Sequence, residues 1–268
     1  MVENVARLTP TPRMTPFIEV SGLEKRYDTR NGPINAIEKV SFSVSKGEFI
    51  SIVGPSGCGK STLMKMIGKL LQPTSGSIRF HGLPAGADSP DLGMVFQDAV
   101  LLPWRTVFQN VCLPIEVMGL ERAKYERRAR ELIELVGLKG FENKYPSELS
   151  GGMQQRTSIA RALVSDPSLL LMDEPFGALD ALTRETMTQE LQRIWMESKK
   201  TVLFITHSIP ESVLLSDRVV VMSARPSKVQ EIIDIDLPRP RQLTDTTSAA
   251  FGKYVSHIRG LLSATTEL

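Results

Sequence analysis

Short apolar runs alternate with longer amphipathic stretches along much of the chain. The runs are rich in Val, Ile, Leu and Phe, which is typical of strands buried on both faces of a sheet. They lie at residues 49–54, 92–97, 168–175, 201–207 and 218–224. Between some of them, apolar residues recur at helical spacing, as in 61–71 and 181–200. Strands that alternate with helices predict an α/β fold with a mostly parallel sheet covered on both faces.

The first part of the chain has a different pattern. Residues 17–27 and 34–48 alternate as strands do and are joined by the turn sequence "TRNGP", and 77–82 add a further strand. This pattern predicts an N-terminal antiparallel β portion beside the main sheet. Residues 1–16 are rich in Pro and Thr, and we expect them to form a flexible arm.

A helical segment interrupts the alternation between about residues 100 and 165. Within it, 121–137 carry charges on one face and apolar residues on the other, and Gly137 is placed to end the helix. We therefore expect an α-helical lobe inserted into a domain that spans 17–241. The remaining residues, 242–268, are expected to form a C-terminal tail with a surface helix near 249–262.

Composition narrows the class of protein. The chain has 268 residues, is 41% hydrophobic and carries a formal net charge of +2, which is ordinary for a globular domain and argues against a nucleic-acid partner. Its two cysteines, Cys58 and Cys112, are too few for a disulfide framework. Neither a secretory signal nor an apolar run of the ~18–20 residues that cross a bilayer is visible. We expect a cytosolic chain that reaches a membrane only through a partner.

The sequence "GPSGCGKS" matches the phosphate-binding loop pattern G-x-x-x-x-G-K-[ST], known as the P-loop, and lies between a predicted strand and a predicted helix. Its backbone N–H groups and the helix N-terminus attract a phosphate, Lys60 reaches its outer oxygens, and Ser61 offers a hydroxyl to Mg²⁺. A chance glycine turn is the alternative, and Cys58 is expected to contribute only its N–H rather than a reactive thiol. The predicted phosphate-binding residues are Gly54, Pro55, Ser56, Gly57, Cys58, Gly59, Lys60, Ser61 and Thr62.

Two carboxylates follow an apolar strand in "LLLMDE". Asp173 is suited to orient Mg²⁺, and Glu174 to act as the general base that polarises an attacking water. The alternative is that one of the pair only caps a loop. His207 stands where the apolar run "TVLFITH" ends, at the same predicted sheet edge, which favours a contact with the terminal phosphate over a purely structural role.

A second glycine-containing turn, "LSGGMQQR", precedes a predicted helix. Ser150 supplies a hydroxyl, Gly151 and Gly152 expose backbone N–H groups, and the helix from Met153 directs its positive end toward an anion. The alternative is a glycine-rich helix cap that binds no ligand.

Taken together in this order, "GPSGCGKS", "LSGGMQQR", "LLLMDE", "ALD" and "TH" make the chain resemble the ATP-binding subunits of ATP-binding-cassette (ABC) transporters over residues 17–226. The resemblance implies a P-loop NTPase core that binds ATP and Mg²⁺. It implies that Tyr27 stacks on adenine, where a tyrosine packed on the sheet is the alternative. It also implies that Gln97 ligates Mg²⁺ and senses the γ-phosphate, and that His207 holds the γ-phosphate and the attacking water.

The same resemblance implies that the turn at "LSGGMQQR" contacts a nucleotide bound by a second subunit. Two cassettes of this family close head to tail, so that Ser150, Gly151 and Gly152 of one chain cover the γ-phosphate in the P-loop of the other. Asp180 in "ALD" is implied at the boundary between the two subunits. We therefore expect a second copy of the chain as a partner.

The apolar sequence "LLPW" (101–104) follows Gln97 and suits the docking of a permease helix, although Leu101 and Leu102 can equally pack the lobe itself. Within the family, the sequences "VLLPWRTVFQNV", "SARPSKV" and "LPRPR" look most like those of the nitrate, sulfonate and taurine importers. Those importers use two permease chains and an external solute-binding protein. The expected place is then the cytoplasmic face of the cell membrane, peripherally bound. A soluble ABC-type ATPase serving DNA repair or cofactor assembly is the alternative. A small-molecule kinase shares the P-loop but has no use for "LSGGMQQR".

Overall fold

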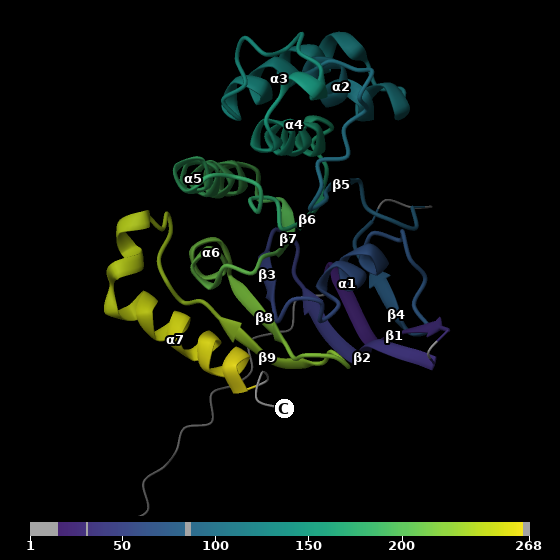
Figure 1. The fold of residues 1–268 in the computed structure, drawn as a ribbon, viewed down its shortest axis with the longest axis vertical. Helices are drawn as coiled ribbons and strands as arrows, with labels where there is room; N and C mark the ends of the chain where they lie inside the picture. The colour runs from purple at the N-terminus through teal and green to yellow at the C-terminus, as the bar shows by residue number, and fades with distance from the viewer. Residues whose placement is uncertain (1–15, 31, 84–86, 265–268) are drawn as a thin grey trace, which may run out of the picture.

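A computed structural model of the protein describes residues 16–30, 32–83 and 87–264. Within these residues the chain forms a six-stranded sheet and a three-stranded sheet, with helices packed around them (Figure 1). The predicted α/β fold with a mostly parallel sheet and a smaller antiparallel portion is confirmed. Residues 1–15, almost all of the predicted arm, lie outside the described residues.

The larger sheet has the strand order β5-β6-β7-β3-β8-β9. Each neighbouring pair is parallel except β8 and β9, which are antiparallel. Because the strands are parallel, their carboxyl ends finish at one edge of the sheet. The bounds are β3 (Phe49–Val53), β5 (Leu92–Val95), β6 (Leu169–Asp173), β7 (Thr201–Ile205), β8 (Arg218–Met222) and β9 (Val229–Asp234).

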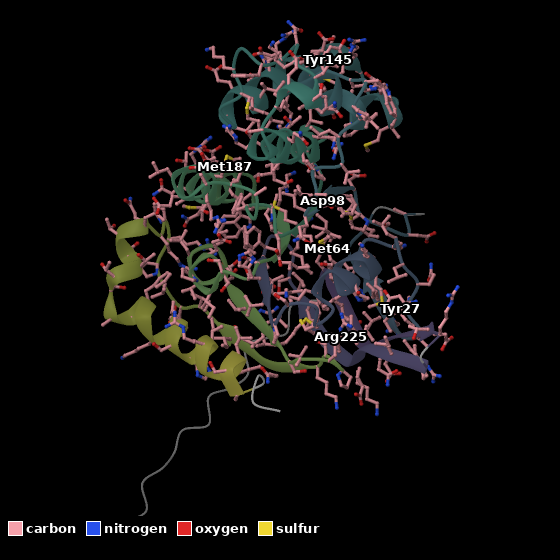
Figure 2. All side chains as sticks on the ribbon, viewed as in Figure 1. Tyr27, Met64, Asp98, Tyr145, Met187 and Arg225 are labelled. Atoms are coloured by element: carbon pink, nitrogen blue, oxygen red, sulfur yellow. The ribbon has the colours of Figure 1, made fainter. Side chains whose placement is uncertain are left out.

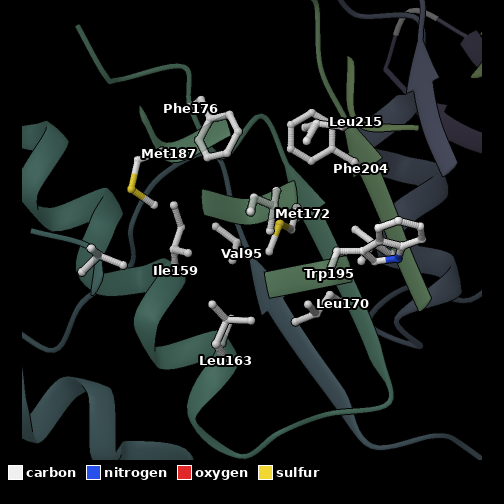
Figure 3. Close-up of a cluster of buried hydrophobic side chains, with 14 of the residues drawn as sticks. Val95, Ile159, Leu163, Leu170, Met172, Phe176, Met187, Trp195, Phe204 and Leu215 are labelled. Atoms are coloured by element: carbon white, nitrogen blue, oxygen red, sulfur yellow. The ribbon is translucent and has the colours of Figure 1, made fainter. Parts of the chain in front are cut away.

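Alternate residues of these strands enter two separate hydrophobic cores. Leu170 and Met172 of β6 join the core under α4 to α7, whereas Leu169 and Leu171 join the core shared with α1 and the smaller sheet. Figure 3 shows part of the first core, including Leu170, Met172 and Trp195. In the same core, the ring of Trp195 meets that of Phe49 edge-on at a centroid distance of 6.0 Å. Successive side chains of a strand point to opposite faces of the sheet. A strand with a hydrophobic core on each face is therefore expected to be apolar at successive positions.

The smaller sheet has the order β2-β1-β4 and is antiparallel throughout, with β1 (Ile18–Thr29), β2 (Gly32–Val44) and β4 (Ser75–Phe80). It covers the second core together with α1 (Lys60–Ile67). The prediction that this helix runs to residue 71 was wrong, because it ends at Gly68 and Lys69 takes a left-handed backbone with φ 56°.

Four helical segments gather at one end of the molecule, α2 (Val107–Val117), α3 (Arg122–Leu135), the short 3₁₀ turn η1 (Pro146–Glu148) and α4 (Gly151–Val164) (Figure 1). Gly137 lies one residue past the end cap of α3 at φ 69°. Its N–H donates to the Glu134 carbonyl and that of Leu138 to Ile133, both at 2.9 Å. This pair of bonds closes the helix end in the way that glycine permits.

The carboxyl-terminal segment packs against the core. After β9 the chain forms a 3₁₀ turn, η2 (Leu243–Thr247), and α7 (Ala249–Ala264). The helix expected near 249–262 is present, but its description as a surface helix was incomplete, because Phe251 and Ile258 are buried in the first core. Figure 1 shows α7 lying beside α6 (Ile209–Leu215) and β8, away from α2 and α3.

One buried arginine ties this segment to the end of α6. Arg241 is 3% exposed, and its guanidinium donates only to backbone carbonyls. Burial, with the neighbouring Arg239, lowers the pKa of Arg241 to about 10. The acceptors lie at the end of α6 and along the exit from β9, namely the carbonyls of Val213, Leu214, Ser216, Ile235 and Leu237.

Arg241→Ala should lower the free energy of unfolding by roughly 2–4 kcal/mol, because it leaves several buried carbonyls without a donor. Urea unfolding followed by circular dichroism measures the change. Arg259→Ala, which removes an exposed arginine of α7, is the matched control and should stay within about 0.5 kcal/mol of the parent protein. Equal stability of the two variants would show that the guanidinium anchors nothing.

Candidate functional site

The predicted phosphate loop joins β3 to α1 in a tight turn. Gly57 and Gly59 adopt φ values of 72° and 111°, which other residues rarely take. A Cβ on Gly54 would lie 2.9 Å from the Cys58 sulfur and 3.0 Å from the Met222 carbonyl oxygen. The loop therefore needs its glycines both for its curvature and for its close packing on the end of β8.

Lys60 lies folded across this loop. The side chain is 5% exposed, and its ammonium donates to the Gly54 and Pro55 carbonyls at 2.9 and 3.1 Å. Lys60 is also the first residue of α1, whose first N–H groups have no partner inside the helix. A cation and a helix N-terminus thus converge on one loop, which is the arrangement that binds a phosphate.

Asp173 ends β6 as a buried carboxyl. It is 4% exposed, and its Oδ1 has no hydrogen-bond partner. Burial raises the pKa of Asp173, the charge of Glu174 raises it further, and a hydrogen bond with the Ser61 hydroxyl works in the opposite direction. An unpartnered buried oxygen beside a hydroxyl suits a hard divalent cation.

The described residues contain no cluster of three or more His, Cys, Asp or Glu side chains that could cage a metal by themselves. Mg²⁺ commonly takes only one or two protein oxygens and completes its shell with water and substrate phosphates. Ser61 and Asp173 fit that pattern beside the phosphate loop.

Three predicted catalytic side chains meet at the carboxyl edge of the sheet. Glu174 Oε2 lies 3.3 Å from Nδ1 of His207 and 3.5 Å from Nε2 of Gln97. The three residues follow β6, β7 and β5, which are neighbours in the sheet. Glu174 takes a left-handed backbone, φ 46°, and its N–H donates to the Ile205 carbonyl of β7 at 2.9 Å. The turn therefore directs the carboxylate toward His207.

Buried hydrogen bonds hold the His207 turn. Thr206 is 2% exposed and donates to the Glu211 carboxylate at 2.6 Å, while its oxygen accepts from the Ser208 N–H at 3.0 Å. Burial raises the pKa of Glu211, and the Thr206 hydroxyl works against that rise. Ser208 caps α6 by accepting from the Glu211 N–H. His207 itself is more than half exposed, so its imidazole is free to meet a ligand.

Sequence reasoning missed Gln155. This glutamine of α4 is 1% exposed, and its amide donates to the Phe96 carbonyl at 2.9 Å, one residue before Gln97. Its other amide atom, Oε1, is buried without a partner. Two consecutive glutamines in "LSGGMQQR" were the available signal, because one of them must face the helix's buried side. Gln155 links the helix that follows Ser150 to the segment that carries Gln97.

The second glycine turn lies at the exposed start of α4. The helix begins at Gly151 rather than at the predicted Met153, and Ser150 caps it by accepting from the Met153 N–H at 3.3 Å. Ser150 and Gly151 are exposed, and a Cβ on Gly151 would meet nothing within 4 Å. The helix-cap geometry is therefore present, and the N-terminus is open to a ligand.

Two further predicted residues lie on the surface. Tyr27 is 38% exposed near the end of β1, opposite Ile34, and the Lys25 ammonium lies 5.2 Å from its ring centroid (Figure 2). Asp180 caps α5 (Ala181–Ser198), accepting from the Thr183 N–H at 3.0 Å, and these backbone bonds lower the pKa of Asp180. Within the described part of the chain, no hydrogen bond or ion pair joins Tyr27 or Asp180 to another predicted site residue.

The loop after Gln97 is held by side-chain hydrogen bonds to its backbone and is partly apolar. Asn110 is fully buried and donates to the carbonyls of Leu102, Arg105 and Thr106. Leu101 and Leu102 are half-buried, but Trp104 is 70% exposed and Val100 is 60% exposed. Packing of the lobe by Leu101 and Leu102 stays a prediction, since neither belongs to the two hydrophobic cores, and Trp104 presents an exposed aromatic side chain.

Comparisons with known proteins agree with this geometry. A family model described as "ABC transporter" matches residues 37–177. An uncharacterized ABC transporter ATP-binding protein of Methanocaldococcus jannaschii is 46% identical over 250 residues, covering 93% of this chain and 92% of the relative. The aliphatic sulfonates import ATP-binding protein SsuB of Bacillus cereus is 41% identical and covers 89% of this chain and 94% of the relative.

The nitrate import ATP-binding protein NrtC of Synechococcus elongatus is 46% identical over 85% of this chain, a match that spans 35% of that longer protein. Among solved structures, a dimer of the ATP-binding cassette MJ0796 in a post-hydrolysis state with ADP and Pi has a TM-score of 0.74 and 32% identity. That match covers 82% of this chain and all of the MJ0796 chain. Among the described residues, the helices are all too short or too polar to span a membrane.

Asp173→Asn should raise the melting temperature of the ligand-free protein at pH 7. The pKa of Asp173 is raised on folding, so its ionised form opposes folding above the unfolded value of 3.8, and neutral Asn removes that penalty. Each kcal/mol gained in the free energy of unfolding raises the melting temperature by about 2–4 °C in a protein of this size. Below pH 3.8 both states are protonated, so the gain should vanish there.

Differential scanning calorimetry across this pH range tests the expectation, with the exposed Asp236→Asn as the control. A lower melting temperature for Asp173→Asn at pH 7 would contradict it.

Proposed function

The chain belongs to the ABC transporter family and is an ATP-binding, ATP-hydrolysing subunit; from that premise we propose that two copies close on ATP and drive the import of a small anion through permease partners. The observation that carries the proposal is the meeting of Gln97, Glu174 and His207 at the sheet edge that also carries Lys60 and Asp173. A nucleotide-binding module without catalysis has no use for that convergence.

Glu174 acts as the general base. Its carboxylate takes a proton from a water whose oxygen bonds to the γ-phosphorus, and the bond from that phosphorus to the bridging oxygen breaks. ADP leaves with the bonding electron pair, and inorganic phosphate is the second product. Gln97 and His207 both reach Oε2 of Glu174, so they fix its position, and exposed His207 can also hold the γ-phosphate.

Lys60 and the loop Gly54–Ser61 bind the phosphates, and Tyr27 supplies an aromatic face for adenine. Base stacking on such a face is worth roughly 1–3 kcal/mol in nucleic-acid systems. Mg²⁺, when bound, neutralises phosphate charge, and Ser61, Asp173 and Gln97 are the residues proposed to hold it. The unpartnered Oδ1 of Asp173 supports that assignment.

A second copy of the chain completes the site. Ser150, Gly151 and Gly152 sit at an open helix N-terminus, where an anion gains roughly 0.3–1 kcal/mol at the surface and up to about 2 kcal/mol when partly buried. Asp180 is exposed and suits the boundary between subunits. The dimeric structure of the related cassette MJ0796, which holds ADP and Pi, supports a pairing of two copies.

Closure of the dimer is transmitted to a permease through the loop after Gln97. Trp104 and Val100 give this loop an exposed apolar surface, and Asn110 and Arg161 hold its backbone in place. The nitrate and sulfonate import relatives support a small anion such as nitrate, a sulfonate or taurine as the solute, delivered by an external binding protein. The chain would then act as a peripheral protein at the cytoplasmic face of the membrane.

Glu174→Gln should keep ATP binding, lower ATP turnover by about 100-fold or more, and trap a closed dimer, because the general base is lost while the phosphate contacts remain. Light scattering with Mg-ATP measures the mass, and phosphate release measures turnover. In the matched double variant, Ser150→Arg is added to block the open helix end, and it should bind ATP yet stay monomeric. A single variant that remains monomeric in ATP would refute the shared site.

Purification from detergent-solubilised membranes should recover the chain with an integral-membrane protein. Trp104→Ala should reduce that recovery about tenfold, because aromatic anchors carry much of an interface's binding energy. Leu70→Ala, at a position that is 60% exposed beyond α1, is the control and should not change it. Recovery with cytosolic proteins alone would favour the soluble ABC-type ATPase instead.

A further inference from the structure

The turn between β8 and β9 reaches the phosphate loop. Arg225 of this turn donates a hydrogen bond from Nε to the Gly57 carbonyl. A Cβ placed on Gly57 would lie 3.3 Å from Nη2 of Arg225, so the guanidinium lies directly against the loop backbone at that residue. Arg225 belongs to "SARPSKV", a sequence whose structural role the proposed function leaves open.

The turn is itself held firmly, so Arg225 is presented from a fixed base. Ser223 Oγ accepts from the Lys228 N–H at 2.9 Å, and the Ser223 N–H donates to the Lys228 carbonyl at 2.9 Å. Buried Ser227 accepts from the Glu38 N–H at 2.9 Å and so joins the turn to β2. The turn therefore bridges the smaller sheet, the larger sheet and the phosphate loop.

The bond from Arg225 fixes one particular peptide group of the loop. The carbonyl of the Gly57–Cys58 peptide accepts from Arg225, and the N–H of the same peptide donates to the Pro55 carbonyl at 3.2 Å. With both polar atoms bonded, the plane of this peptide cannot rotate freely. Gly57 has left-handed backbone and no side chain, so without these bonds its peptide would have considerable freedom.

We propose that Arg225 is a positioning residue that pre-orders the phosphate loop for nucleotide binding. A loop already in its binding geometry loses less conformational entropy when the phosphates arrive, and that saving appears as affinity. Arg225 acts on the loop backbone and leaves the water, Glu174 and His207 untouched, so it governs nucleotide affinity and KM rather than kcat. The proposal rests on the proposed function only in that the loop binds ATP.

Two variants separate the hydrogen bond from the charge. Arg225→Ala removes both. Arg225→Gln keeps an N–H donor at the same number of bonds from the backbone as Nε, but has no charge. Lys228→Ala is the control, because Lys228 lies in the same turn and its ammonium pairs with Glu38 at 3.4 Å instead of the loop.

Affinities for ATP and for ADP are measured by isothermal titration calorimetry on the full chain, and kcat, KM and the melting temperature are measured alongside. Arg225→Ala should bind both nucleotides about fivefold to tenfold more weakly, the loss typical of one intramolecular hydrogen bond. Arg225→Gln and Lys228→Ala should stay within about twofold of the parent, and kcat at saturating ATP should change by less than about twofold in all three.

Parent-like binding by Arg225→Ala would overturn the proposal. Equal losses of nucleotide affinity in Arg225→Ala and Arg225→Gln would also overturn it, since charge alone would then explain the effect. An equal loss of affinity in Lys228→Ala would overturn it as well, because it would indicate general damage to the turn. If the parent chain binds no ATP, the proposed function fails. If the parent binds ATP and Arg225→Ala has the same affinity as Arg225→Gln or Lys228→Ala, only the inference about Arg225 fails.

Discussion

The structure depends on one constraint, which is the parallel direction of the strands in the larger sheet. Five of its six strands run the same way, so their carboxyl ends finish at one edge. Hydrogen-bonded neighbours lie about 4.8 Å apart, so the residues that follow β5, β6 and β7 must come close. Gln97, Glu174 and His207 are neighbours for that reason, and the phosphate loop leaves the same edge after β3.

Many of the side chains that shape the site act on backbone carbonyls. Gln155 bonds the Phe96 carbonyl, Asn110 bonds three carbonyls of the apolar loop, Lys60 bonds two in the phosphate loop, and Arg225 bonds Gly57. Bonds to carbonyls fix the path of loops that have no sheet or helix ladder of their own. The parallel sheet brings Gln97, Glu174 and His207 together, and these side-chain bonds hold the neighbouring loops in place.

The sheet and the convergence of Gln97, Glu174 and His207 could be predicted because both leave a pattern in side chains. β6 and β7 contain the uninterrupted apolar runs "LLLM" and "VLFI", and polar residues follow both runs at once. The contacts of Gln155, Arg225 and Arg241 could not be predicted, because their partners are backbone carbonyls, which every residue carries. The end of α1 at Gly68 was missed because apolar residues continue past Lys69, where the left-handed backbone turns the chain. The domain limits, the nucleotide contacts of Tyr27 and Ser150, and the place of Asp180 at the subunit boundary stay predictions.

The anchor made by Arg241 has a consequence for how the molecule responds to its surroundings. Its guanidinium holds five carbonyls and no carboxylate. Carbonyls do not titrate in the acid range, and a buried contact of this kind is poorly screened by dissolved ions. Acidification or added salt weakens ion pairs such as that between Arg193 and Glu197 well before it reaches this attachment. The segment that leads from β9 toward the carboxyl-terminal helix is therefore held against α6 by contacts that neither acid nor added salt readily weakens.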